Sequence, residues 1–181
     1  MTPTSPYKLQ VKIITKDEIL PYVKAIQEDI LDNGLKKDLI IYKWYKDLYH
    51  RFSLYTLVFD EDDNFIAYSG NDLNDNSIKI LCHLYVIRKY RTIYRSITQT
   101  DLIPFMVDFA ENNGYDSIWY SMEVSDPHRS KYATSQKRHL NGGKLDSKYM
   151  PFWKDFEYVG QVVYNHVIQE KFEKKINKNR R

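Results

Sequence analysis

The stretch IKILCHLYVIRKYRTIYRSITQTDLIPFMVDFAENNGYDSIWYSMEV, residues 78–124, decides the fold of this chain. Its first ten residues are almost wholly apolar, which is typical of a β-strand covered on both faces. Apolar residues then recur at helical spacing from position 102 to 110, and the sequence NNG at 112–114 ends that helix. Residues 117–124 return to a strand pattern. If the two strands are parallel, the stretch forms a right-handed crossover unit.

The sequence before this stretch predicts a strand followed by two helices. Residues 9–14 alternate between apolar and polar side chains, the period of a half-buried strand. Thr15, with Glu18 three positions later, predicts a capping box at the start of a helix that ends near Asn33. A broad apolar stripe predicts a second helix over residues 37–51.

The remaining elements are short strands and one polar helix. Residues 54–59 and 65–69 are strand-like runs on either side of the turn sequence EDDN, and predict a hairpin. Residues 130–140 predict a polar helix, and residues 156–168 a final strand or hairpin. The order β, α, α, β, β, β, α, β, α, β predicts an α/β fold with a central mixed β-sheet flanked by helices on both faces.

Length and composition are those of one globular domain. Of the 181 residues, 43% are hydrophobic and 28% are charged, and no apolar run approaches the roughly 20 residues needed to span a membrane. We expect a single domain over residues 1–170 and a basic tail over residues 171–181. Because the chain has one cysteine, Cys82, and no secretory signal pattern, we expect a cytoplasmic protein without a membrane partner.

This succession of elements resembles the GCN5-related N-acetyltransferases, the GNAT family, over nearly the whole chain. Residues 84–86, LYV, look like the end of the family's fourth strand, and residues 112–124, NNGYDSIWYSMEV, look like its third helix running into its fifth strand. FEYVG, residues 156–160, is similar to the turn into its late strands. The resemblance implies transfer of an acetyl group from acetyl-CoA to an amine of a small molecule or peptide.

The family's signature Q/R-x-x-G-x-G/A uses glycines so that backbone N–H groups and a helix N-terminus can grip a pyrophosphate. Residues 88–101 contain no glycine, so the signature is degenerate here. Two registers are possible. The first places Arg91, Tyr94 and Ser96 at its three fixed positions, and the second places Arg95, Thr98 and Thr100 there.

Pro104 favours the second register. A helix with Thr100 or Asp101 as its N-cap keeps this proline in or next to the first turn, where a missing N–H is tolerated. Threonine hydroxyls and nearby arginines would then add hydrogen bonds to phosphate. The cofactor-binding residues implied by the resemblance are Tyr85, Val86, Arg91, Arg95, Ser96, Thr98 and Thr100.

Three side chains are candidates for the acid–base chemistry that acyl transfer to an amine requires. His83 has a pKa range suited to a base, although a lone histidine on an apolar strand is also a common structural residue. Glu123 lies near the end of the predicted parallel strand, where sites of open α/β sheets gather, and is equally well explained as a surface carboxylate. Tyr132 is nearest the place of the family's tyrosine acid.

Other functions have less support. The sequence has no G-x-S-x-G, GxxxxGK[ST], CxxC or HExxH motif, and His128 and His139 are too far apart for one helical metal face, so no metal is expected. A GNAT-like binding or structural module without catalysis is the main alternative. Nucleic-acid binding by the basic residues 88–95 and the tail is less favoured, because the net charge is only +3. The oligomeric state is left open.

Overall fold

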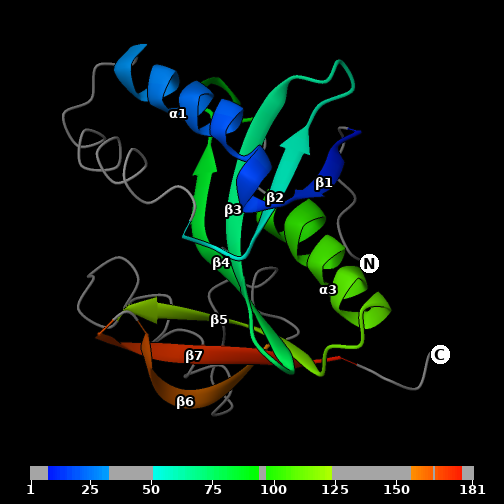
Figure 1. Ribbon diagram of the computed structural model, residues 1–181, viewed down its shortest axis with the longest axis vertical. Coiled ribbons are helices and arrows are strands. Elements are labelled where there is room, and N and C mark those ends of the chain that lie inside the picture. Colours follow the sequence, from blue (N-terminus) through cyan, green and yellow to red (C-terminus); the bar gives the residue numbers. More distant parts are fainter. Residues whose placement is uncertain (1–7, 33–50, 94–96, 124–155, 165, 177–181) are drawn as a thin grey trace. The chain divides into compact units, whose positions relative to one another are not determined.

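The computed structural model describes residues 8–32, 51–93, 97–123, 156–164 and 166–176 (Figure 1). The strands are β1 (Gln10–Ile14), β2 (Leu54–Phe59), β3 (Phe65–Leu73), β4 (Ser77–Val86), β5 (Ser117–Glu123), β6 (Glu157–Tyr164) and β7 (Val167–Lys175). The helices are α1 (Leu20–Asp32) and α3 (Ile103–Asn112), with 3₁₀ turns at Lys16–Glu18 and Arg88–Tyr90 and a π turn at Thr98–Leu102. The predicted helices over 37–51 and 130–140 lie outside the described residues.

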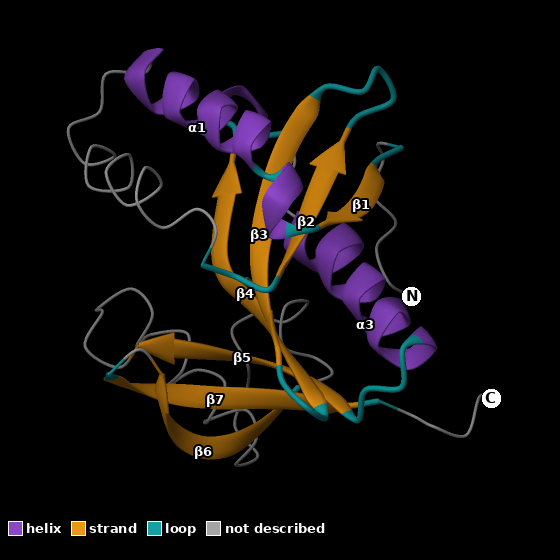
Figure 2. Cartoon of the chain, in the orientation of Figure 1, coloured by secondary structure: helices purple, strands orange, loops and turns teal. Residues whose placement is uncertain are grey.

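The strands form one mixed sheet in the order β1-β2-β3-β4-β5-β7-β6. β4 and β5 are parallel, as the crossover prediction requires, and their ladder pairs Ser77–Lys79 with Ser117–Trp119. The pairs β1–β2, β2–β3, β5–β7 and β6–β7 are antiparallel. The mixed α/β fold is therefore confirmed (Figure 2).

By their contacts the described residues form two compact units. The first contains the chain up to Leu73 together with Leu81–Phe105, and the second contains Asn74–Ile80 together with the residues from Met106 onward. β4 contributes its first half to the second unit and its second half to the first. Each unit has its own buried core, and each is described by itself.

In the first unit, both faces of the β2–β3 pair are covered. Buried residues of α1 at helical spacing pack against one face of β2 and β3, and this core also includes Phe52 and Tyr85. On the opposite face, Ile97 and Leu102 pack against Val58 and Ala67. The residues of α1 in this core are Val23, Ile26 and Ile30, which confirms the predicted stripe.

The local signals of the first unit form as predicted, with small differences. The Thr15 N–H donates to Glu18 Oε2 at 3.1 Å, so the capping box is present, but it closes a 3₁₀ turn and α1 begins only at Leu20. In the β2–β3 turn, the Asp60 carboxylate accepts the backbone N–H groups of Asp62 and Asn64, both at 2.9 Å. This accounts for the predicted hairpin, since aspartate side chains stabilise turns in this way.

The core of the second unit is aromatic. The Tyr120 ring stacks on Phe172 with centroids 5.2 Å apart, and Phe156 meets Tyr120 edge-on at 4.9 Å. Residues 156–168 belong to a hairpin and not to one strand, because β6 pairs with β7 over Glu157–Tyr164. β7 also pairs with β5, so it lies between β5 and β6 (Figure 2).

Two predictions about the strands were wrong, one about the end of β7 and one about the burial of β4. Residues 171–175, assigned to the tail, belong to β7, and the Ile176 N–H donates to the Asp116 carbonyl at 2.8 Å. The regular pairing of β7 with β5 outweighs the basic composition of this segment. In β4 only Ile78–Ile80 and Tyr85 are buried, and Leu84 is 38% exposed, so the strand is not covered along its whole length.

Candidate functional site

The backbone of β4 adopts a strained conformation at Leu81. Its φ angle is 55°, in the left-handed region that leucine rarely adopts. Leu81 packs against the Val58 side of the sheet, whereas Cys82 packs against the α1 side. A residue held in this region costs about 1–3 kcal/mol, and such strained residues cluster at active sites and ligand-binding sites. The conformation of Leu81 therefore indicates β4 as a strand of the candidate site.

His83 lies two residues after Leu81 and is held by a buried phenol. The Tyr68 hydroxyl on β3 lies 2.6 Å from His83 Nδ1, and the two rings lie 5.7 Å apart. Tyr68 is 2% exposed and His83 is partly buried. Because a neutral imidazole has one donor and one acceptor nitrogen, the direction of this hydrogen bond determines whether Nε2 is a donor or an acceptor.

The end of β4 is fixed by a charged hydrogen-bond network. Asp29 Oδ2 on α1 accepts the Tyr85 hydroxyl at 2.8 Å and the Arg88 backbone N–H at 3.1 Å. Arg91 Nε donates to the Val86 carbonyl at 2.8 Å, and its guanidinium lies 5.0 Å from the Tyr85 ring centroid. Three of the predicted cofactor residues, Tyr85, Val86 and Arg91, are thus in contact with one another.

Backbone N–H groups in the first part of the basic segment are already bonded within the chain. Ile87 donates to Ile66, Tyr90 donates to Ile87, and Arg91 donates to Arg88, at 2.8–3.1 Å. A group that binds anions needs N–H donors that are not used by the fold. This part of the segment is therefore structural at the backbone level, and anion binding is better sought downstream.

The helix after the basic segment starts earlier than predicted. Ile97 already has helical φ and ψ angles, and Thr98–Leu102 form a π turn closed by the Ile103 N–H on the Thr98 carbonyl. The prediction of Thr100 or Asp101 as N-cap was wrong. Pro104 has no N–H to donate, and the wider turn just before it lets the helix continue past that missing bond.

Thr98 and Thr100 consequently lie in a helical turn and not in an extended loop. The Thr100 hydroxyl donates to the Asp101 carboxylate. Partial burial raises the pKa of the Asp101 carboxyl above its usual value, and the Thr100 bond opposes this only in part. π turns occur disproportionately at functional sites, so the turn is a reasonable place for a ligand-binding backbone.

Of the other predicted site residues, Glu123 is among the described residues. Glu123 is the last residue of β5 and pairs in register with Gln169 of β7. Arg95, Ser96 and Tyr132 lie outside the described residues.

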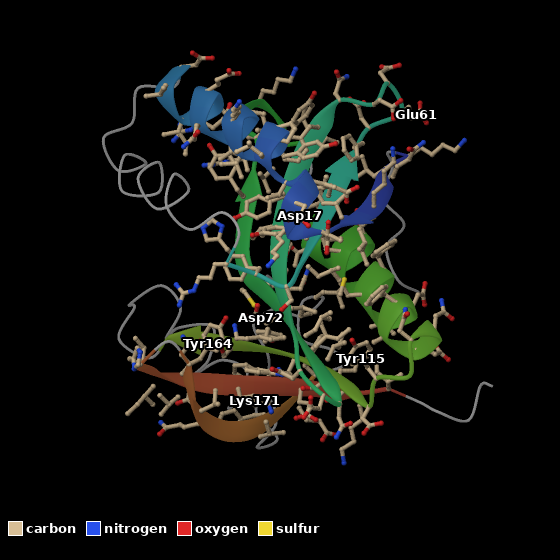
Figure 3. The ribbon with its side chains drawn as sticks, viewed as in Figure 1. Asp17, Glu61, Asp72, Tyr115, Tyr164 and Lys171 are labelled. Carbon is tan, nitrogen blue, oxygen red and sulfur yellow. The ribbon has the colours of Figure 1, made fainter. Side chains whose placement is uncertain are left out.

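The second unit has a cationic and aromatic cluster around the start of β4. Lys79 is 3% exposed, and its Nζ lies 4.0 Å from the Tyr164 ring centroid and 5.4 Å from that of Trp119. Lys171 Nζ lies 4.6 Å from the Trp119 centroid and 3.4 Å from a Glu173 carboxylate oxygen. Tyr164 and Lys171 of this cluster come from β6 and β7 (Figure 3). Because such contacts stabilise buried ammonium groups, Lys79 is accommodated in the sheet.

Sequence reasoning missed Asp29 and Tyr68. Asp29 flanks the buried stripe of α1, between Ile26 and Ile30, and Tyr68 belongs to a strand with continuous burial. Their polar atoms could be recognised as candidates, but their partners are 56 and 15 residues away in the sequence. Among the described residues there is no group of side chains that could hold a metal ion, and no helix is long and apolar enough to cross a membrane.

Comparisons with solved structures find this fold in several acetyltransferases. RimL, a ribosomal alpha-N-protein acetyltransferase in complex with coenzyme A, has a TM-score of 0.55 at 12% identity, covering 98% of each chain. A chimera of the spermidine N-acetyltransferase SpeG from Vibrio cholerae and hSSAT has a TM-score of 0.54 at 12% identity, covering 96% of this chain and 99% of the other. An N-acetyltransferase from Staphylococcus aureus Mu50 gives 0.54 at 13%, covering 93% and 98%.

No protein-family model and no curated protein matches the sequence. The likenesses nevertheless extend over nearly the whole of this chain and of the other chains. The predicted GNAT resemblance is therefore confirmed for the fold.

Proposed function

We propose that this chain, which has the GNAT fold, is an acyltransferase that moves an acetyl group from acetyl-CoA to a primary amine. The observation with most weight is the strained backbone at Leu81, in the parallel strand that leads into the basic segment and the π turn. A fold is compatible with many functions, whereas the chemistry of a protein depends on the residues of its site.

The residues present fit a thioester cosubstrate with a pyrophosphate. The backbone at Tyr85 and Val86 lies at the end of β4, and the segment between β4 and α3 is rich in arginine. We infer that the pantetheine part binds beside Val86 and that the phosphates lie near the start of the π turn, with Thr98, Thr100, Arg95 and Ser96. Arginine and hydroxyl donors suit phosphate oxygens. The Asp101 carboxyl lies in the same turn, and burial raises its pKa.

The reaction forms a bond between the amine nitrogen and the acetyl carbon and breaks the carbon–sulfur bond. It needs a base for the amine proton and an acid for the departing thiolate. We propose His83 or Glu123 as the base and Tyr132 as the acid. His83 is supported by its fixed orientation on Tyr68, since a base must be held within reach of the proton it takes.

The acceptor is proposed to be an amine of a small molecule or a peptide. The structurally similar proteins are described as acting on spermidine or as alpha-N-protein acetyltransferases. Both acceptors present an amine to the thioester, which is the feature that the proposal retains for this chain.

The test is a thiol-release assay with acetyl-CoA and a panel of polyamines, amino sugars and peptides with free N-termini. Turnover with at least one amine, reduced at least 100-fold in either His83→Gln or Glu123→Gln, supports the proposal and identifies the base. Binding of acetyl-CoA without turnover on any acceptor would indicate a GNAT-like module that has lost catalysis.

A further inference from the structure

We infer that Asp29 is a positioning residue that holds the end of β4 in the geometry required for acetyl-CoA, an inference that rests on the proposed function. Asp29 lies on α1, one helical turn after Ile26 and directly before Ile30, both of which are buried in the core. Its side chain is partly buried. It would act through Tyr85 and Arg88, without itself touching the cosubstrate.

One carboxylate oxygen of Asp29 accepts two hydrogen bonds. Asp29 Oδ2 receives the Tyr85 hydroxyl at 2.8 Å and the Arg88 backbone N–H at 3.1 Å. These donors come from either side of Val86 and Ile87, so the carboxylate closes a loop around the last residues of the strand. Hydrogen bonds to an ionised carboxylate are about twice as strong as neutral ones.

The enclosed backbone is the part of β4 proposed to meet the pantetheine. The Ile87 N–H is fixed on the Ile66 carbonyl at 2.8 Å, and the Val86 carbonyl accepts Arg91 Nε at 2.8 Å. The Arg91 guanidinium also lies against the Tyr85 ring, 5.0 Å from its centroid. Asp29 therefore orients the ring on which Arg91 rests as well as the backbone that follows it.

Loss of the Asp29 carboxylate would release residues 85–88 without unfolding the protein. Tyr85 is 3% exposed and the Arg88 N–H is part-buried in its bond, so both donors would lose an acceptor in a poorly hydrated place. α1 would keep its apolar contacts through Val23, Ile26 and Ile30. We expect the affinity for acetyl-CoA to fall about tenfold, because small displacements at a binding site are costly.

The helix offers a matched control. Asp32, also on α1, is exposed, so Asp32→Ala removes the same charge from the same helix without touching β4. Asp29→Asn keeps an oxygen that can accept a hydrogen bond, and should recover part of the affinity lost in Asp29→Ala. Tyr85→Phe removes only the hydroxyl that meets Asp29, so its effect on the affinity for acetyl-CoA should be smaller than that of Asp29→Ala.

The experiment measures acetyl-CoA binding by calorimetry and amide hydrogen exchange at Arg88 for the five proteins, with circular dichroism to show that each is folded. The expected result is weaker binding and faster exchange in Asp29→Ala, partial recovery in Asp29→Asn, and wild-type values in Asp32→Ala. If the wild type binds acetyl-CoA and the affinity of Asp29→Ala is within twofold of the wild-type value, the role of Asp29 is overturned while the proposed function stands. If the wild type does not bind, both are overturned.

Discussion

The hydroxyl of Tyr68 and Nδ1 of His83 lie 2.6 Å apart, which joins the third and fourth strands through a buried phenol and an imidazole. If Tyr68 donates, the neutral imidazole has its proton on Nε2 and cannot accept one there. If Nδ1–H donates to Tyr68, Nε2 is an acceptor and His83 can act as a base. The orientation of the ring is the same in both cases.

Tyr68→Phe should lower kcat/KM about fivefold if His83 is the base, because one buried hydrogen bond contributes about 1 kcal/mol and its loss frees the ring. The pH at which kcat/KM rises should also shift, since the environment of the imidazole changes. Rates measured between pH 6 and 9 would show this. Tyr55→Phe is the control, because Tyr55 packs against Tyr68 with ring centroids 5.9 Å apart. An unchanged pH profile in Tyr68→Phe would argue against His83 as the base.

Leu81→Val should destabilise the first unit more than Leu84→Val does. A β-branched side chain is strongly disfavoured at the φ of 55° that residue 81 adopts, whereas Leu84 is 38% exposed and has no such constraint. We expect a difference of about 1–2 kcal/mol in the free energy of unfolding. Urea denaturation would measure it. Equal losses in the two variants would mean that residue 81 is not strained in solution.

Asp101→Asn should leave the protein at least as stable as the wild type at neutral pH. Burial raises the pKa of the folded carboxyl, so folding favours the protonated form. The wild type therefore loses stability as pH rises from the ordinary aspartate range, about pH 4, through the raised pKa. The variant has no such loss. Thermal unfolding from pH 3 to 8 should give the two proteins the same melting temperature at low pH and the variant the higher one at neutral pH. A wild type whose melting temperature rises relative to that of the variant as pH increases would contradict this account.

Gly70→Ala should destabilise the core beneath α1. A Cβ atom at this position would lie 2.4 Å from Phe52 Cδ2, far inside contact distance, and the ring is itself buried. Overpacking of this kind costs about 1–3 kcal/mol. Urea denaturation of Gly70→Ala with and without Phe52→Leu would separate the clash from other effects. Failure of the smaller side chain to recover any stability would show that the contact is not the cause.

The sequence predicted elements whose signal is local. The α1 stripe of Val23, Ile26 and Ile30 and the turn around Asp60 depend on spacing and on short-range hydrogen bonds, and both form. The apolar run of β4 and the strand at 117–124 also predicted the parallel crossover correctly.

Features that depend on long-range packing could not be predicted. Leucine has no preference for positive φ, so nothing in the sequence indicates the left-handed conformation of Leu81. The contacts of Tyr85 with Asp29 and of His83 with Tyr68 join residues that are far apart in the chain. The early helix start was missed because the Pro104 argument assumed an α-helical first turn, whereas the chain forms a π turn.

The most direct test of the central claim is calorimetric titration of the wild-type protein with acetyl-CoA. The proposed function predicts saturable binding of one molecule per chain, accompanied by a rise in melting temperature as the ligand concentration increases. Absence of heat and of any thermal shift at millimolar acetyl-CoA would contradict it.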